Sequence, residues 1–121
     1  MTARLTFLAP ISGLGAHTAF DLTPVDGSES LFTLRAVADP DLRLFVVDPS
    51  VLFPDYAPVL PDETIDALNA QDGVTLLSVA RSTPEGVCLN LLAPIVVSAT
   101  TGVAVQVILE GQDLPLDATL A

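Results

Sequence analysis

Apolar and polar residues alternate with a period of two over much of the chain. Leu5 to Leu8, Leu31 to Val37 and Val103 to Leu109 show the alternation most clearly. Residues two apart lie on the same face of a β-strand, so each run predicts a strand with one buried face. Proline, glycine, aspartate and serine cluster between the runs, as is typical of turns. The pattern predicts about eight strands, the others being Phe20 to Leu22, Leu42 to Val47, Val74 to Ala80, Val87 to Leu92 and Ile95 to Val97.

One segment has helical spacing. In Asp62 to Leu68, Ile65 and Leu68 lie three apart, and acids fill the first turn, where the helix dipole favours negative charge. Before it, the proline-rich residues 48–58 are predicted to form an ordered, extended connection. We therefore predict one mainly β domain over residues 1–121, either a small antiparallel β-barrel-like fold or a sandwich, with one short helix.

The stretch from Gly86 to Leu109 contains no charged residue and is long enough to cross a membrane as a helix. Its interior argues against a helix, because Ser98, Thr100, Thr101 and Gly102 cluster where a turn would lie. The alternation beyond them has the period of a strand. We predict a buried β-hairpin here, and a cytoplasmic protein without a membrane segment.

Charge narrows the choice of partners. Fifteen acidic residues face four arginines and no lysine, giving a formal charge of −11 and a pI near 4.1. Such a surface repels phosphate backbones and anionic headgroups and attracts basic partners. With one histidine, one cysteine and one tyrosine, few side chains titrate near neutral pH. We therefore expect neither direct nucleic-acid binding nor enzymatic activity, and we interpret Cys88 as a buried packing residue.

No motif for a cofactor, metal or catalytic site is recognisable. The acids at Asp39, Asp41 and 62–66 lack the spacing of a calcium loop, and no histidine or cysteine accompanies them. We expect no catalytic residue, no cofactor and no metal. Two alternatives stay open at this point: an acidic β-barrel module that binds a ligand or cation through its turns, and a small hydrolase with paired carboxylates.

Two longer motifs carry a family resemblance. Residues 42–56 read LRLFVVDPSVLFPDY, and residues 89–97 read LNLLAPIVV, followed by QVIL from Gln106. A strand FTLRA at 32–36 and a DPD turn at 39–41 precede the first motif. In this order, over about residues 5–116, the motifs resemble the flagellar assembly factor FliW family.

The resemblance implies a small, mostly antiparallel, barrel-like protein without catalytic activity. It also implies two partners: newly made flagellin, and the RNA-binding translational repressor CsrA if the host has one. By this resemblance, the protein released by exported flagellin captures CsrA and relieves repression of flagellin translation. The acidic surface agrees with a basic partner such as CsrA. We further expect a monomer.

Five residues are candidates for partner binding. Asp48, Asp55 and Tyr56 match the first motif, and carboxylates beside an aromatic ring suit a basic partner. Phe53 belongs to the same loop, and Asn90 lies in the second motif. Structural roles stay open for most of them, because Asp48 precedes a proline, Phe53 and Tyr56 can cover the barrel, and a buried Asn90 needs hydrogen-bond partners.

Overall fold

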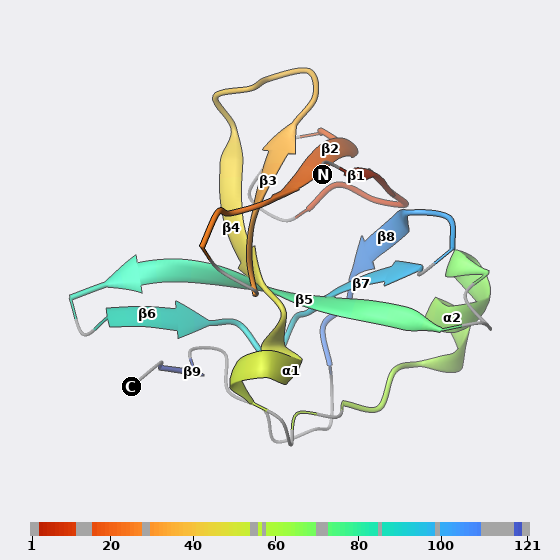
Figure 1. The fold of residues 1–121 in the computed structure, drawn as a ribbon. Coiled ribbons are helices and arrows are strands. Elements are labelled where there is room, and N and C mark those ends of the chain that lie inside the picture. The colour runs from red at the N-terminus through yellow and green to blue at the C-terminus, as the bar shows by residue number, and fades with distance from the viewer. Residues whose placement is uncertain are drawn as a thin grey trace.

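The computed structural model describes residues 3–11, 16–27, 30–53, 56, 58–69, 73–84, 86–98, 100–109 and 118–119. These residues contain the strands β1 (Ala3–Phe7), β2 (Ala19–Pro24), β3 (Leu31–Ala36), β4 (Arg43–Val47), β5 (Val74–Thr83), β6 (Gly86–Leu89), β7 (Ile95–Ser98), β8 (Val103–Gln106) and β9 (Ala118–Thr119). Two short helices, α1 (Pro49–Leu52) and α2 (Asp62–Leu68), lie between β4 and β5 in the chain (Figure 1).

Seven strands close into a barrel. The hydrogen-bonded order is β4-β3-β2-β1-β8-β7-β5, and β5 pairs with β4 to complete the ring. All these pairs are antiparallel except β1 and β8, which run parallel, so the barrel is mixed. The long strand β5 also pairs with β6, and β6 pairs with β9. The predicted barrel-like fold is confirmed, and closure explains why so apolar a chain leaves few strand edges unpaired.

The barrel interior is filled by the alternating apolar residues of its strands. Phe20 and Leu34 are fully buried, and the Phe7 ring meets the Phe20 ring edge-on with centroids 5.4 Å apart. This core cluster comprises Leu5, Phe7, Ile11, Phe20, Leu34, Ala36, Val46, Leu77, Ile95, Val97 and Ala104. The period of two in the sequence therefore corresponds to an inner apolar face and an outer, more polar one.

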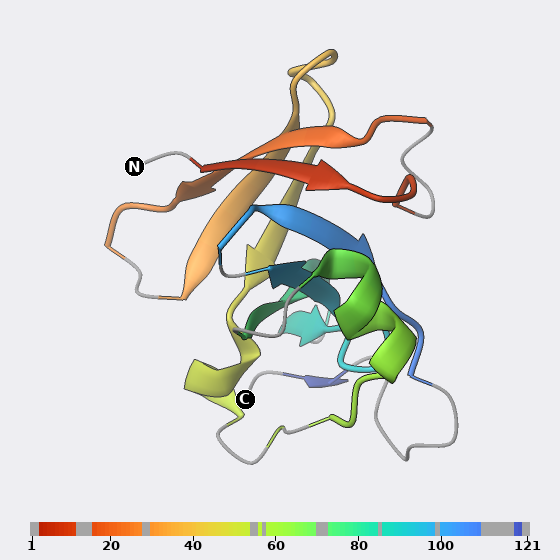
Figure 2. The ribbon, with the colours of Figure 1, turned by 90° about the vertical axis from the view of Figure 1, so that its right-hand side faces the viewer.

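Helix α2 covers a second apolar cluster on the outside of the barrel (Figure 2). Leu68 of α2 packs with Val96 of β7, and valines of β8 surround them. Asp62 and Glu63 lie in the first turn, as the dipole favours. The helix ends at Asn69, which adopts a left-handed conformation with φ of 54°, a conformation that asparagine tolerates well. The predicted helix is thus confirmed with its bounds.

The structure corrects two predictions of secondary structure. Residues 49–52 form the helix α1, where an extended connection was expected, so there are two short helices and not one. The sheet is mixed, because β1 and β8 run parallel. Pro49 occupies the first turn of α1, where its missing N–H is not needed. The prolines that suggested an extended chain are therefore compatible with this single turn.

The uncharged stretch from Gly86 onward forms strands. It contains β6, β7 and β8, and β7 pairs with β8 in the predicted hairpin. Within the residues described, the helices are too short and too polar to cross a membrane. Cys88 is a buried cysteine of β6, in agreement with a packing role.

Candidate functional site

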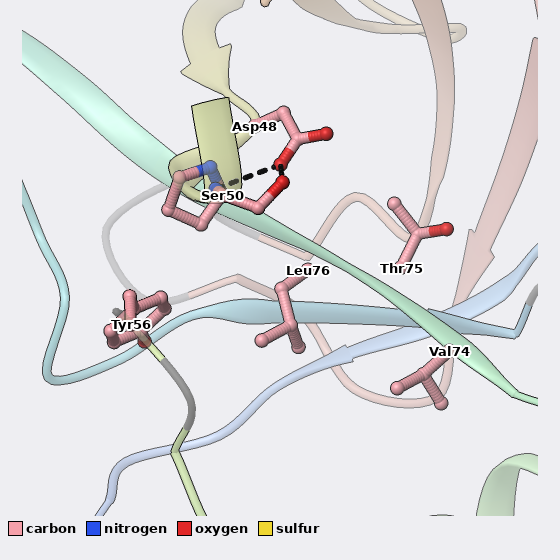
Figure 3. A pocket seen from close by; sticks show the side chains of 7 residues that line it. Asp48, Ser50, Tyr56, Val74, Thr75 and Leu76 are labelled. Atoms are coloured by element: carbon pink, nitrogen blue, oxygen red, sulfur yellow. Dashed lines mark hydrogen bonds between the residues drawn. The ribbon is translucent and has the colours of Figure 1, made fainter. Parts of the chain in front are cut away.

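Asp48 begins the loop that carries most of the candidate residues. It is the N-cap of α1, and its Oδ1 accepts a hydrogen bond from the Ser50 backbone N–H at 3.0 Å. The Ser50 hydroxyl donates to the same oxygen at 2.6 Å. An aspartate at this position satisfies backbone groups that the helix leaves unpaired. Asp48 therefore has a structural role, while its second carboxylate oxygen points away from Ser50 (Figure 3).

Tyr56 is anchored to the second sequence motif. Its hydroxyl donates a hydrogen bond of 2.6 Å to the backbone carbonyl of Leu91. The side chain is half-buried, and this burial raises the pKa of Tyr56 to about 12. Its backbone N–H donates to the carbonyl of Phe53 at 2.9 Å, which shapes the turn after α1. Tyr56 thus joins the loop after β4 to the segment after β6.

Phe53 packs with Tyr56 against the outside of the barrel. Both half-buried aromatic side chains contact a cluster built on the buried residues Val47, Leu89 and Leu91. Leu31 and Ala80 complete this aromatic cluster. The covering role that the sequence left open for Phe53 and Tyr56 is therefore the one they have in the fold, and each side chain stays partly exposed.

Asn90 shapes the backbone next to the Tyr56 anchor. Its Oδ1 accepts hydrogen bonds from the N–H groups of Leu92 at 3.1 Å and Ala93 at 3.0 Å. Its own N–H donates to the Val79 carbonyl at 3.1 Å. Such side-chain bonds to residues two and three positions ahead stabilise a turn. Asn90 positions Leu91, whose carbonyl receives the Tyr56 hydroxyl.

A shallow cleft of about 270 Å³ lies between α1 and β5 (Figure 3). Asp48 and Tyr56 stand on its rim and Leu76 between them. The residues that line it are Asp48, Pro49, Ser50, Tyr56, Val74, Thr75 and Leu76. The cleft offers one carboxylate, hydroxyl groups and apolar side chains, a combination suited to holding a basic or donor group beside an apolar one.

The cleft brings residues of the first motif together with residues of β5. Asp48 and Tyr56 line it, while Phe53 and Asn90 support it from the aromatic cluster and from the turn beside it. Asp55 lies outside the described residues. Ser50 and the β5 residues were not identified as site residues, because only the pairing of β4 with β5 brings the start of β5 near α1. In the described part of the chain, no three histidine, cysteine or acidic side chains converge to hold a metal.

Replacing Tyr56 with phenylalanine is expected to remove a pH dependence of stability. The Tyr56 pKa is about 12 in the folded protein and about 10 in an unfolded chain, so the unfolded state loses its proton first. Stability gained from the buried phenol is complete below pH ~10 and falls as the pH rises toward ~12. We expect a loss of about 1 kcal/mol over this window, reduced by partial exposure.

Urea unfolding of both proteins at pH ~9 and ~11.5 measures this loss. The two proteins differ only in the Tyr56 hydroxyl, so the difference between their pH dependences isolates the phenol. Because this is the only tyrosine and the chain has no tryptophan, absorbance of the phenolate reports its pKa directly. A parallel decline of both proteins with pH would contradict the expectation.

Comparison with known proteins gives one family. The family model described as FliW protein matches residues 2–120. A Flagellar assembly factor FliW 2 from Desulfotalea psychrophila is 34% identical over 110 residues, covering 88% of this chain and 73% of that protein. A Flagellar assembly factor FliW from a Thermotoga species, strain RQ2, is 34% identical over 88 residues, which cover 69% of this chain and 59% of that protein.

A solved structure supports the fold. A crystal structure of a flagellar assembly factor FliW superposes with a TM-score of 0.84 at 24% identity, covering 94% of this chain and 82% of that chain. The curated relatives are named as assembly factors, in agreement with the expected absence of catalysis. Since the family model extends over residues 2–120 and a named member is 34% identical to this chain over 110 residues, this chain belongs to the FliW family.

Proposed function

We propose that this protein is a cytoplasmic flagellar assembly factor that binds flagellin and, where the host has one, the translational repressor CsrA. The observation that carries the proposal is the family match over residues 2–120. Relatives with 33% and 34% identity over 88% of this chain are named flagellar assembly factors. In this role, the protein would couple flagellin translation to flagellum assembly by exchanging one partner for the other.

The cleft beside α1 is the proposed partner site. It combines the Asp48 carboxylate with the Tyr56 ring, both from the motif that most resembles the family. The net charge of −11 favours encounter with a basic repressor surface. Asp55 belongs to the proposed site through its place in the same motif, and Phe53 and Asn90 belong to it as supporting residues.

Calorimetry with the host's flagellin monomer tests the first half of the proposal. We expect one-to-one binding with a Kd of about 1 µM or tighter. Asp48→Asn keeps an N-cap but removes the charge, and Tyr56→Ala removes the ring, so each is expected to weaken binding about tenfold. Tyr56→Phe keeps the ring and serves as the matched control for Tyr56→Ala. No heat of binding at about 50 µM protein would reject flagellin as the partner.

The repressor is tested separately with purified CsrA from a host that has it. We expect binding that weakens as salt is raised, because acidic and basic surfaces attract each other less when screened. Asp55→Lys, which reverses a charge in the first motif, is expected to weaken it further. An affinity for CsrA that changes neither with salt nor with this substitution would contradict an electrostatic role for the motif.

A further inference from the structure

Three of the four arginines of this acidic protein are aligned across neighbouring strands of the barrel. The sequence has four, Arg4, Arg35, Arg43 and Arg81. In the sheet, Arg4 is opposite Asp21, Asp21 is opposite Arg35, and Arg35 is opposite Arg43. Directly opposed residues on neighbouring strands share a face. The row across β1, β2, β3 and β4 is therefore continuous, and we call it the arginine row; its members are Arg4, Asp21, Arg35 and Arg43.

The arginine row lies on the outer face of the barrel. The neighbouring residues Leu5, Phe20 and Leu34 point into the core and are buried, so the row points the other way. All three arginines of the row are exposed. Their charges are thus presented to solvent from β1, β3 and β4.

Arg35 and Arg43 are the two arginines of the row that can pair with carboxylates of a partner. Arg4 Nε forms an ion pair with Asp21 Oδ1 at 2.6 Å, so the one acid in the row is already paired with Arg4. Arg35 and Arg43 form no ion pair with any carboxylate in the described part of the chain, although they stand opposite each other. Like charges in directly opposed positions destabilise a sheet. The fold alone gives no reason to place them together.

An apolar groove continues from the arginine row. Phe45 follows Arg43 by two residues, so it lies on the same face, and the Arg43 guanidinium stands 5.2 Å from the centre of its ring. The groove has a volume of about 210 Å³ and is lined by Leu31, Phe45, Ala80, Arg81 and Val87. Phe45 is 41% exposed and Val87 40% exposed, so both apolar side chains of the groove are open to solvent.

We propose that the arginine row and this groove form one docking surface for an acidic segment of another protein. Carboxylates of the segment pair with Arg35 and Arg43, and a large apolar side chain enters the groove beside Phe45. Charge complementarity selects this occupant, because Arg35 and Arg43 place two positive charges side by side next to the apolar groove.

The spacing of the row indicates the form of the segment. Neighbouring strands lie about 4.8 Å apart, so opposed arginines present their charges at a similar interval. Acidic residues four positions apart on a helix are about 6 Å apart at their Cβ atoms. A helix with such a glutamate pair and a phenylalanine on the same side matches both the row and the groove. This surface goes beyond the proposed function, since it requires neither flagellin nor CsrA.

Fluorescence anisotropy with a synthetic helical peptide of this design, labelled with fluorescein, tests the proposal. We expect saturable binding with a Kd below about 100 µM at low salt, and at least tenfold weaker binding when the peptide's glutamates are replaced by glutamine. Arg35→Gln with Arg43→Gln, and separately Phe45→Ala, are each expected to weaken binding about tenfold or more. The arginine double variant should be at least as stable as the parent, because it removes opposed like charges.

Ala67→Glu is the matched control, because it also makes the net charge more negative but lies at an exposed position of α2. It should bind the peptide as the parent does. The proposal is overturned if the peptide fails to saturate by about 1 mM, or if the arginine double variant and the control bind equally well. Tighter binding of a single-stranded oligonucleotide than of the peptide, lost in the same double variant, would also overturn it.

Discussion

Replacing Gly102 with alanine is expected to lower the free energy of unfolding by about 2–3 kcal/mol. Gly102 has φ of +74°, a backbone conformation that costs a residue with a Cβ about 1–2 kcal/mol. A Cβ at this position would also lie 2.9 Å from the backbone carbonyl oxygen of Arg4. Since that oxygen belongs to β1, it cannot move aside without disturbing the pairing of β1 with β8.

Gly27→Ala separates the two causes. Gly27 also has a positive φ, of +83°, but a Cβ there would meet nothing within 4 Å. It should therefore show the conformational cost alone, about 1 kcal/mol. Thermal unfolding followed by circular dichroism measures both, and we expect the melting temperature of Gly102→Ala to fall by roughly 10 °C. Equal losses in the two variants would show that the close approach of β1 contributes nothing.

Phe20→Ala is expected to have a larger effect, a loss of about 4 kcal/mol. The Phe20 ring is fully buried between strands of the barrel and makes an edge-on contact with Phe7. Its removal leaves a cavity that a closed barrel is poorly able to fill, because neighbouring strands are tied on both sides. Natural domains have only ~5–15 kcal/mol of stability, so the variant should unfold at much lower urea concentration.

Phe45→Ala is the matched control for this prediction. It makes the same substitution on the outer face, where the ring is 41% exposed and contacts the Arg43 guanidinium. We expect it to cost about 1 kcal/mol or less. The pair of variants therefore compares the two faces of one sheet, and similar losses would contradict the assignment of Phe20 to the core and Phe45 to the surface.

Local patterns predicted the elements, while contacts between distant residues decided the topology. The alternation after Val103 correctly predicted β8, and the cluster from Ser98 to Gly102 correctly predicted the turn before it. Nothing in the local pattern of β1 indicates a parallel neighbour almost a chain length away. The helix α1 was missed because four residues are too few to show helical periodicity, although Asp48 before Pro49 is a good helix start.

The candidate site was predictable only in part for the same reason. Asp48 and Tyr56 belong to one continuous motif, so their shared place on the cleft follows from a short loop. Thr75 and Leu76 reach the cleft only through the pairing of β5 with β4. The arginine row is an extreme case, since its members are separate in sequence and only the register of four strands aligns them.

The parallel pairing of β1 with β8 delays closure of the barrel during synthesis of the chain. Thr6 and Val103 are register partners, although 97 positions (103 − 6) separate them along the chain. At about 5–20 residues per second, a ribosome needs roughly 5–20 s to synthesise that interval. During this time, the outer edge of β1 has no β8 to pair with, so the barrel stays open even after β5 can pair with β4. The pairing of β1 with β8, which completes the ring, therefore follows the synthesis of every other barrel strand.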